Sequence, residues 1–148
     1  KNIGHEYIKD TEARYREEAR AVVPTPWGKF NDLMQGGLGN GDFGLIFGNP
    51  GGGKSWTLVA MGGYAVKLGF NVVHYTLELG EDYVGRRYDA FFTGKPVDTL
   101  FKNRDKIDEI VKELPGQLII KEYAPGQATV NTLRSHLQKC EDLDFTQI

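Results

Sequence analysis

One glycine-rich loop constrains this chain more than any other part of it. Residues 48–55 read GNPGGGKS and match the pattern G-x-x-x-x-G-K-[ST]. A short apolar run at residues 43–48 precedes the loop, and an apolar helical pattern follows it from residue 54. A buried strand before such a loop and a helix directly after it form the context in which the pattern binds phosphate groups. We therefore predict that the loop binds a nucleoside triphosphate, rather than serving only as a turn.

The pattern assigns a role to each residue type in the loop. Glycines let successive backbone N–H groups curve around a phosphate without side-chain clashes, and the following helix adds its positive N-terminal end. Lys54 is expected to reach the β- and γ-phosphates, and Ser55 to give its hydroxyl to Mg²⁺. The pattern thus predicts a nucleoside triphosphate and Mg²⁺ as cofactors. The predicted binding residues of the loop are Gly48, Asn49, Pro50, Gly51, Gly52, Gly53, Lys54 and Ser55.

The composition is that of a soluble globular domain. Of the 148 residues, 40% are hydrophobic and 26% charged, and the formal net charge is -2. No basic patch indicates nucleic-acid binding by this chain itself. No run of about 18 apolar residues predicts a membrane span. The single cysteine, Cys140, excludes an internal disulfide framework and fits a reducing cytoplasm.

Hydrophobic periodicity predicts strands that alternate with helices. The expected strands are residues 43–48, 71–79 and 117–124, and the expected helices are residues 29–35, 54–68, 81–92, 103–114 and a last one capped by Thr129. This alternation favours an α/β fold with a mostly parallel sheet. Residues 5–21 are charged and helix-prone, typical either of a solvated surface helix or of an arm that docks on a neighbouring subunit. We divide the chain into a linker helix, 1–23, and a core, 24–148.

The segments around the loop resemble a known family. Residues 24–56, PTPWGKFNDLMQGGLGNGDFGLIFGNPGGGKSW, resemble the beginning of a RecA-type P-loop ATPase core. Residues 68–94, LGFNVVHYTLELGEDYVGRRYDAFFTG, are similar to DnaB-type replicative helicases, especially those of bacteriophages. In that family a strand ends in Ser/Thr-Leu/Met-Glu-Met/Leu and an arginine follows nine residues after the glutamate. Glu78 and Arg87 occupy these two positions here.

The resemblance implies a function for the whole protein. It implies an ATP-hydrolysing motor that moves along single-stranded DNA as a homo-hexameric ring, in the cytoplasm of a bacterial host if a phage encodes it. Lys54 and Glu78 are the catalytic residues that it implies, and Arg87 a nucleotide contact. The position of Glu78 agrees with this role and equally with that of a solvated acid, because open α/β sheets bind ligands at the carboxyl ends of their strands and a carboxylate there can activate water.

Each assignment has a plainer alternative. Glu78 is otherwise a solvated acid at a strand end, and Arg87 a surface arginine paired with Glu81 or Asp82. Trp56, next to Ser55, is included among the candidate nucleotide-binding residues, although packing is the alternative to base stacking.

The resemblance also implies a Walker B strand ending in Asp, further DNA-binding loops and an arginine from the next subunit. After Cys140 the sequence reads EDLDFTQI, before any such strand. We therefore expect a RecA-like core truncated before Walker B, with weak turnover by itself. Two other functions stay open at this point. One is a recombinase-like or circadian-clock-type relative, and the other is a nucleotide-binding module without productive hydrolysis.

Overall fold

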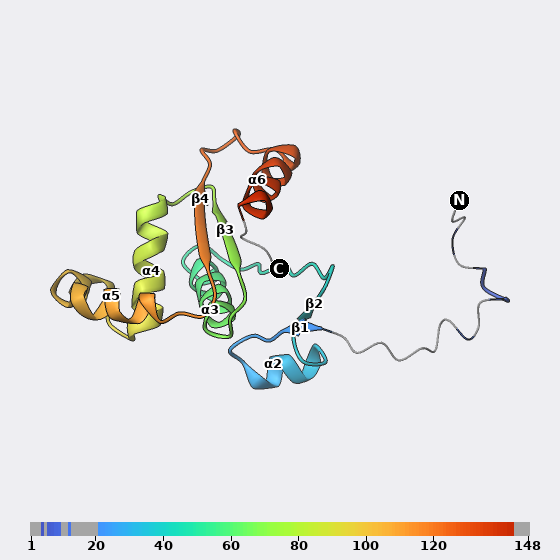
Figure 1. Ribbon diagram of the computed structural model, residues 1–148, viewed down its shortest axis with the longest axis horizontal. Helices are drawn as coiled ribbons and strands as arrows, with labels where there is room; N and C mark the ends of the chain where they lie inside the picture. Colours follow the sequence, from blue (N-terminus) through green and yellow to red (C-terminus); the bar gives the residue numbers. More distant parts are fainter. Residues whose placement is uncertain (1–3, 5, 10–11, 13–20, 144–148) are drawn as a thin grey trace.

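The computed structural model describes residues 4, 6–9, 12 and 21–143 as an α/β arrangement around a small parallel sheet (Figure 1). Strand β3, Val72–Thr76, pairs in parallel with strand β4, Leu118–Glu122, so that Val72 lies opposite Leu118 and Thr76 opposite Glu122. Both strands were predicted from their β-branched, apolar composition. Because the strands are parallel, their carboxyl ends meet at one edge of the sheet.

Four α-helices follow the glycine-rich loop in the described part of the chain, and all four were predicted. They are α3, Lys54–Lys67; α4, Glu81–Thr93; α5, Arg104–Lys112; and α6, Val130–Asp142. The predicted cap of α6 is confirmed, since the Thr129 side chain accepts from the backbone N–H of Thr132 and the Thr132 hydroxyl accepts from that of Thr129. A 3-10 helix, η1, Val97–Asn103, leads into α5 and was not predicted.

The two faces of the sheet carry different helices. Neighbouring residues of a strand point to opposite faces, and His74 and Tyr75 mark the two sides. The His74 Nδ1 atom lies 2.9 Å from the Tyr88 hydroxyl of α4, whereas the Tyr75 hydroxyl lies 2.8 Å from the His136 Nδ1 atom of α6. Figure 1 shows α4 and α6 on opposite sides of the strands.

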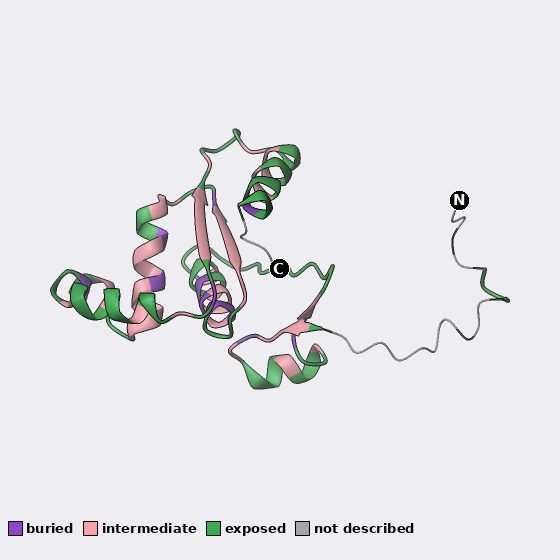
Figure 2. Ribbon diagram, viewed as in Figure 1, coloured by how far each residue is buried: buried purple, intermediate pink, exposed green. Residues whose placement is uncertain are grey.

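The hydrophobic core lies where α3, α4 and the sheet meet (Figure 2). Val59 of α3 and Val84 and Tyr88 of α4 are buried at its centre. The partly buried side chains that pack against them are Leu79, Phe91, Phe92, Leu118 and Ile120. This face of the sheet therefore fixes α3 and α4, the two helices that begin at the carboxyl edge of the strands.

A smaller unit precedes the glycine-rich loop. Strands β1, Val22–Val23, and β2, Leu38–Gly39, form an antiparallel pair that was not predicted, and helix α2, Gly28–Leu33, lies between them as the sequence indicated. The Asn31 side chain joins α2 to Thr25 through three hydrogen bonds of 2.7–2.8 Å, which satisfy the buried Thr25.

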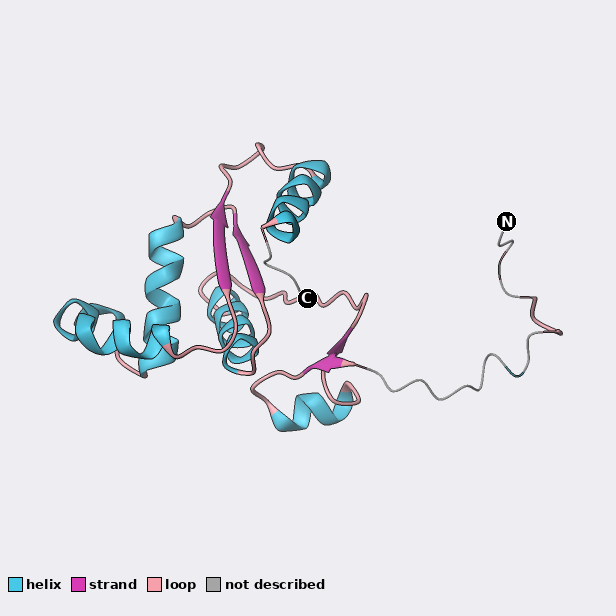
Figure 3. Cartoon of the chain, in the orientation of Figure 1, coloured by secondary structure: helices cyan, strands magenta, loops and turns pink. Residues whose placement is uncertain are grey.

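The predicted strand at residues 43–48 is wrong. These residues adopt no strand (Figure 3), and Phe43, Leu45 and Phe47 are 89%, 72% and 87% exposed. A strand needs hydrogen-bonded neighbours, and in the described part of the chain β3 pairs only with β4. The apolar composition predicted a buried strand, and neither the burial nor the strand is present, because no described strand or helix covers these side chains.

Two further predictions concern the N-terminal linker helix and membrane-spanning segments. The predicted linker helix at residues 5–21 falls outside them, apart from residues 6–9, 12 and 21. Among the helices that the structure describes, none has the length and hydropathy to cross a bilayer.

Candidate functional site

The loop before α3 is a tight turn built on its glycines. The Gly52 N–H donates to the Asn49 carbonyl over 3.1 Å, and Gly51 and Gly53 both have left-handed backbone angles, with φ of +76° and +86°. A Cβ on Gly52 would lie 3.0 Å from the Asn49 oxygen, a tighter contact than most Cβ atoms make, so this backbone oxygen would have to shift slightly. Left-handed residues at alternate positions turn successive N–H groups toward one concave side, which is a common anion-binding geometry.

Lys54 closes this loop and begins α3. Its ammonium donates to the carbonyls of Gly48, at 3.0 Å, and of Asn49, at 2.9 Å. An ammonium has three N–H donors, so two carbonyls leave room for an anionic acceptor. Gly53 is the N-cap residue and has no side chain to satisfy the first N–H groups of α3. The positive end of the helix and the Lys54 charge therefore lie on the same loop.

A cavity of about 210 Å³ lies beside the loop and brings three predicted site residues together. Ser55 reaches it from the first turn of α3, Glu78 from the segment after β3, and Arg87 from α4. These residues come from separate elements that the sheet and the core hold in place. The cavity thus combines a hydroxyl, a carboxylate and a guanidinium next to the glycine-rich loop.

A hydrogen-bonded turn presents Glu78 at the end of β3. The buried Thr76 hydroxyl donates to the Leu79 carbonyl over 2.8 Å and accepts from the Leu79 N–H over 3.1 Å. These two bonds bring residues 76 and 79 together and leave Leu77 and Glu78 at the exposed tip. Glu78 therefore owes its place to a side chain–backbone turn.

Arg87 lies against aromatic rings. Its guanidinium carbon is 5.0 Å from the centre of the Trp56 ring and 4.9 Å from that of the Tyr83 ring. Glu81, which the alternative paired with Arg87, instead forms an ion pair with Lys121, with 3.1 Å between the carboxylate and the ammonium. Trp56 is 44% exposed, so it packs on Arg87 while part of its ring stays in contact with solvent.

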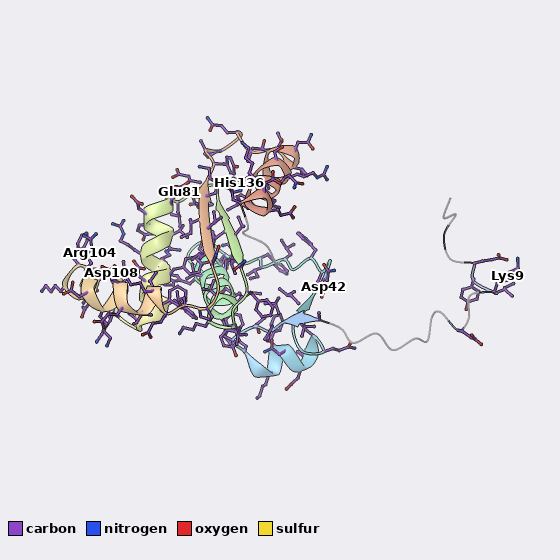
Figure 4. All side chains as sticks on the ribbon, in the orientation of Figure 1. Lys9, Asp42, Glu81, Arg104, Asp108 and His136 are labelled. Carbon is purple, nitrogen blue, oxygen red and sulfur yellow. The ribbon has the colours of Figure 1, made fainter. Side chains whose placement is uncertain are left out.

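Glu81 and Glu122 fasten α4 to the sheet, and sequence reasoning missed this contact. The Glu81 carboxylate accepts from the Glu122 N–H over 2.9 Å, and the Glu122 carboxylate accepts from the Glu81 N–H over 3.4 Å. The pKa of Glu81 is lowered, first by this backbone N–H and then by Lys121. Figure 4 labels Glu81 at the start of α4, beside the end of β4. An acid in the first turn is a common helix signal, but its partner on β4 is a tertiary contact.

His74 also lines the cavity but belongs to the core. The Tyr88 hydroxyl of α4 is the hydrogen-bond partner of this strand histidine. Burial lowers the pKa of His74 and raises the pKa of Tyr88. Both side chains are therefore uncharged when they form this hydrogen bond.

Comparison with known proteins relates the chain to a replicative helicase. No family model matches it. The chain is 29% identical, over 148 aligned residues, to the DnaB-like replicative helicase of enterobacteria phage T4. The alignment covers 93% of this chain and 31% of the helicase, so the chain spans about a third of the length of this relative.

Proposed function

We propose that this chain is the ATP-binding and ATP-hydrolysing core of a ring-forming replicative DNA helicase with a RecA-like fold. The observation that carries the proposal is the meeting of Ser55, Glu78 and Arg87 on one cavity next to the glycine-rich loop. The likeness to a DnaB-like helicase supports this class over other nucleotide-binding proteins.

The loop binds and orients the triphosphate in this proposal. The backbone N–H groups of residues 48–55 and the Lys54 ammonium neutralise phosphate charge. Ser55 is the residue that holds Mg²⁺, and the oxygen ligands that this ion prefers include a hydroxyl and the phosphates of the substrate. No group of three or more His, Cys, Asp or Glu side chains in the described part of the chain could form a separate metal site. When bound, Mg²⁺ spreads the negative charge of the phosphates.

Glu78 activates the attacking water. Its carboxylate accepts a proton from water as the water oxygen bonds to the γ-phosphorus, and the bond from that phosphorus to the bridging oxygen breaks to leave ADP. The exposed tip after β3 gives the carboxylate access to water in the cavity. Arg87 donates to phosphate oxygens from the opposite wall.

The motor functions are proposed for the whole protein, because the aligned part of this chain corresponds to 31% of the DnaB-like relative. They are translocation on single-stranded DNA, assembly as a homo-hexamer, and completion of each site by an arginine of the next subunit. The DNA-contacting loops are expected in other segments of the protein.

Measuring ATP hydrolysis by the whole protein, with and without single-stranded DNA, tests this function. We expect hydrolysis that single-stranded DNA accelerates, together with unwinding of a forked duplex. Strand exchange without unwinding would point to a recombinase-like relative instead. Tight nucleotide binding without turnover, with or without DNA, would point to a binding module and contradict the motor.

A further inference from the structure

Four side chains on α3 and α4 form a continuous stack of rings and guanidinium groups. The Arg87 guanidinium lies between Trp56, at 5.0 Å, and Tyr83, at 4.9 Å, measured to the ring centres. The Arg86 guanidinium lies over the Tyr83 ring at 5.7 Å. Guanidinium groups are attracted to the faces of aromatic rings at such distances. The two arginines differ, because Arg87 contacts two rings from two helices and Arg86 contacts one.

Position distinguishes Arg87 further. Among the residues that line the cavity with Ser55 and Glu78, Arg87 is the one cation. Trp56 directly follows Ser55 on α3, and Tyr83 precedes Arg87 by one turn of α4. The rings that hold the guanidinium are thus fixed to the two helices that frame the cavity.

We propose that Trp56 and Tyr83 are positioning residues that hold Arg87 for contact with the terminal phosphate of a bound triphosphate. This inference rests on the proposed function. Rings cover the faces of a guanidinium, whereas its N–H donors lie in its plane and stay able to bind two phosphate oxygens. An arginine that is already ordered loses less conformational freedom when it binds its ligand. Trp56 therefore acts through Arg87 and does not stack on the base.

The test compares two nucleotides bound to variants of the full chain. The probes are a slowly hydrolysed ATP analogue and ADP, each with Mg²⁺, measured by isothermal titration calorimetry. The variants Trp56→Leu and Tyr83→Leu each remove one ring, and Trp56→Phe keeps a ring. Because Trp56 and Tyr83 are both more than 40% exposed, these changes are expected to leave the fold intact, which thermal melting checks.

We expect each leucine variant to bind the triphosphate analogue about fivefold more weakly, since one cation–π contact is lost. The affinity of each leucine variant for ADP should stay within about twofold of that of the unchanged chain. Trp56→Phe should keep most of the affinity for the triphosphate analogue. In an Arg87→Gln background, Trp56→Leu should add no further loss. Trp27→Leu removes an exposed ring outside the stack and the cavity, and this matched control should behave as the unchanged chain.

Two results would overturn the positioning role. One is that a leucine variant loses the same affinity for ADP as for the triphosphate analogue. The other is that Trp56→Leu weakens binding as much in the Arg87→Gln background as in the unchanged chain, because Trp56 would then act independently of Arg87. Lys54→Ala distinguishes failure of the positioning role from failure of the proposed function. If the proposed function holds, this variant should weaken the binding of both nucleotides. An unchanged chain that binds neither nucleotide would overturn both the proposed function and the inference.

Discussion

Replacing Glu78 by Gln in the whole protein is expected to lower the rate of ATP turnover by about 100-fold or more, which is the usual contribution of a general base. Glutamine keeps the size of the side chain and its place after the Thr76–Leu79 turn, but it does not accept a proton from water at neutral pH. Binding of the triphosphate should change little, because in the proposed function the loop and Lys54 provide most of the phosphate contacts. Steady-state hydrolysis and calorimetric affinity, measured on the same preparation, separate the two effects.

Glu122→Gln is the matched control for this experiment. Glu122 ends the neighbouring parallel strand, yet it faces the N-terminus of α4 and does not line the cavity. Its substitution should leave turnover within about threefold, since its contact with the Glu81 N–H is long. Equal losses from both variants would mean that carboxylates at this edge act through the fold, and Glu78 would lose its assigned role.

Replacing Gly63 by Ala is expected to lower the free energy of unfolding by about 2 kcal/mol, as overpacking of a well-filled core does. A Cβ at Gly63 would lie 2.6 Å from Cε1 and 3.2 Å from Cγ of the Phe91 ring. Gly63 is buried at the contact between α3 and α4, and Phe91 packs against the core cluster, so the ring has little room to move. Urea unfolding followed by circular dichroism measures the change.

Gly85→Ala is the control, because it places the same methyl group on α4 without a clash. The nearest atom to its Cβ would be Ile120 Cδ1 at 3.9 Å, an ordinary contact. Alanine has the higher helix propensity, so this variant should gain about 0.5–1 kcal/mol. A stabilised Gly63→Ala chain, matching Gly85→Ala, would show that α3 and α4 do not approach as closely as described.

The sequence predicted the elements whose signals are local. The apolar spacing of residues 103–114 and the Thr129 cap lie within single helices, and both α5 and α6 formed where these signals placed them. Residues 43–48 carry the same apolar composition as the strands but form none, because a strand depends on a neighbour that local composition does not contain. The 3-10 helix Val97–Asn103 likewise has no strong periodicity to reveal it.

Parts of the candidate site could likewise be predicted from local sequence, whereas others depend on tertiary packing. The loop residues and Lys54 could be proposed from a short pattern, since one contiguous segment contains all the residues of the proposed phosphate site. The meeting of Ser55, Glu78 and Arg87 depends on the packing of α3, β3 and α4. These three residues could be predicted as candidates from the sequence, but their shared cavity could not. The Trp56–Arg87–Tyr83 stack and the Glu81–Glu122 contact join segments that no spacing rule connects.

The central claim is that the loop at residues 48–55 binds a triphosphate through Lys54. The most direct measurement is the affinity of the chain for a slowly hydrolysed ATP analogue with Mg²⁺, before and after Lys54→Ala. We expect Lys54→Ala to weaken binding by about 100-fold. The variant removes the ammonium from a charge-assisted contact with a multiply charged phosphate and leaves the phosphate without that partner. Equal affinity of the two proteins would contradict the claim, because the loop would then not be the phosphate site.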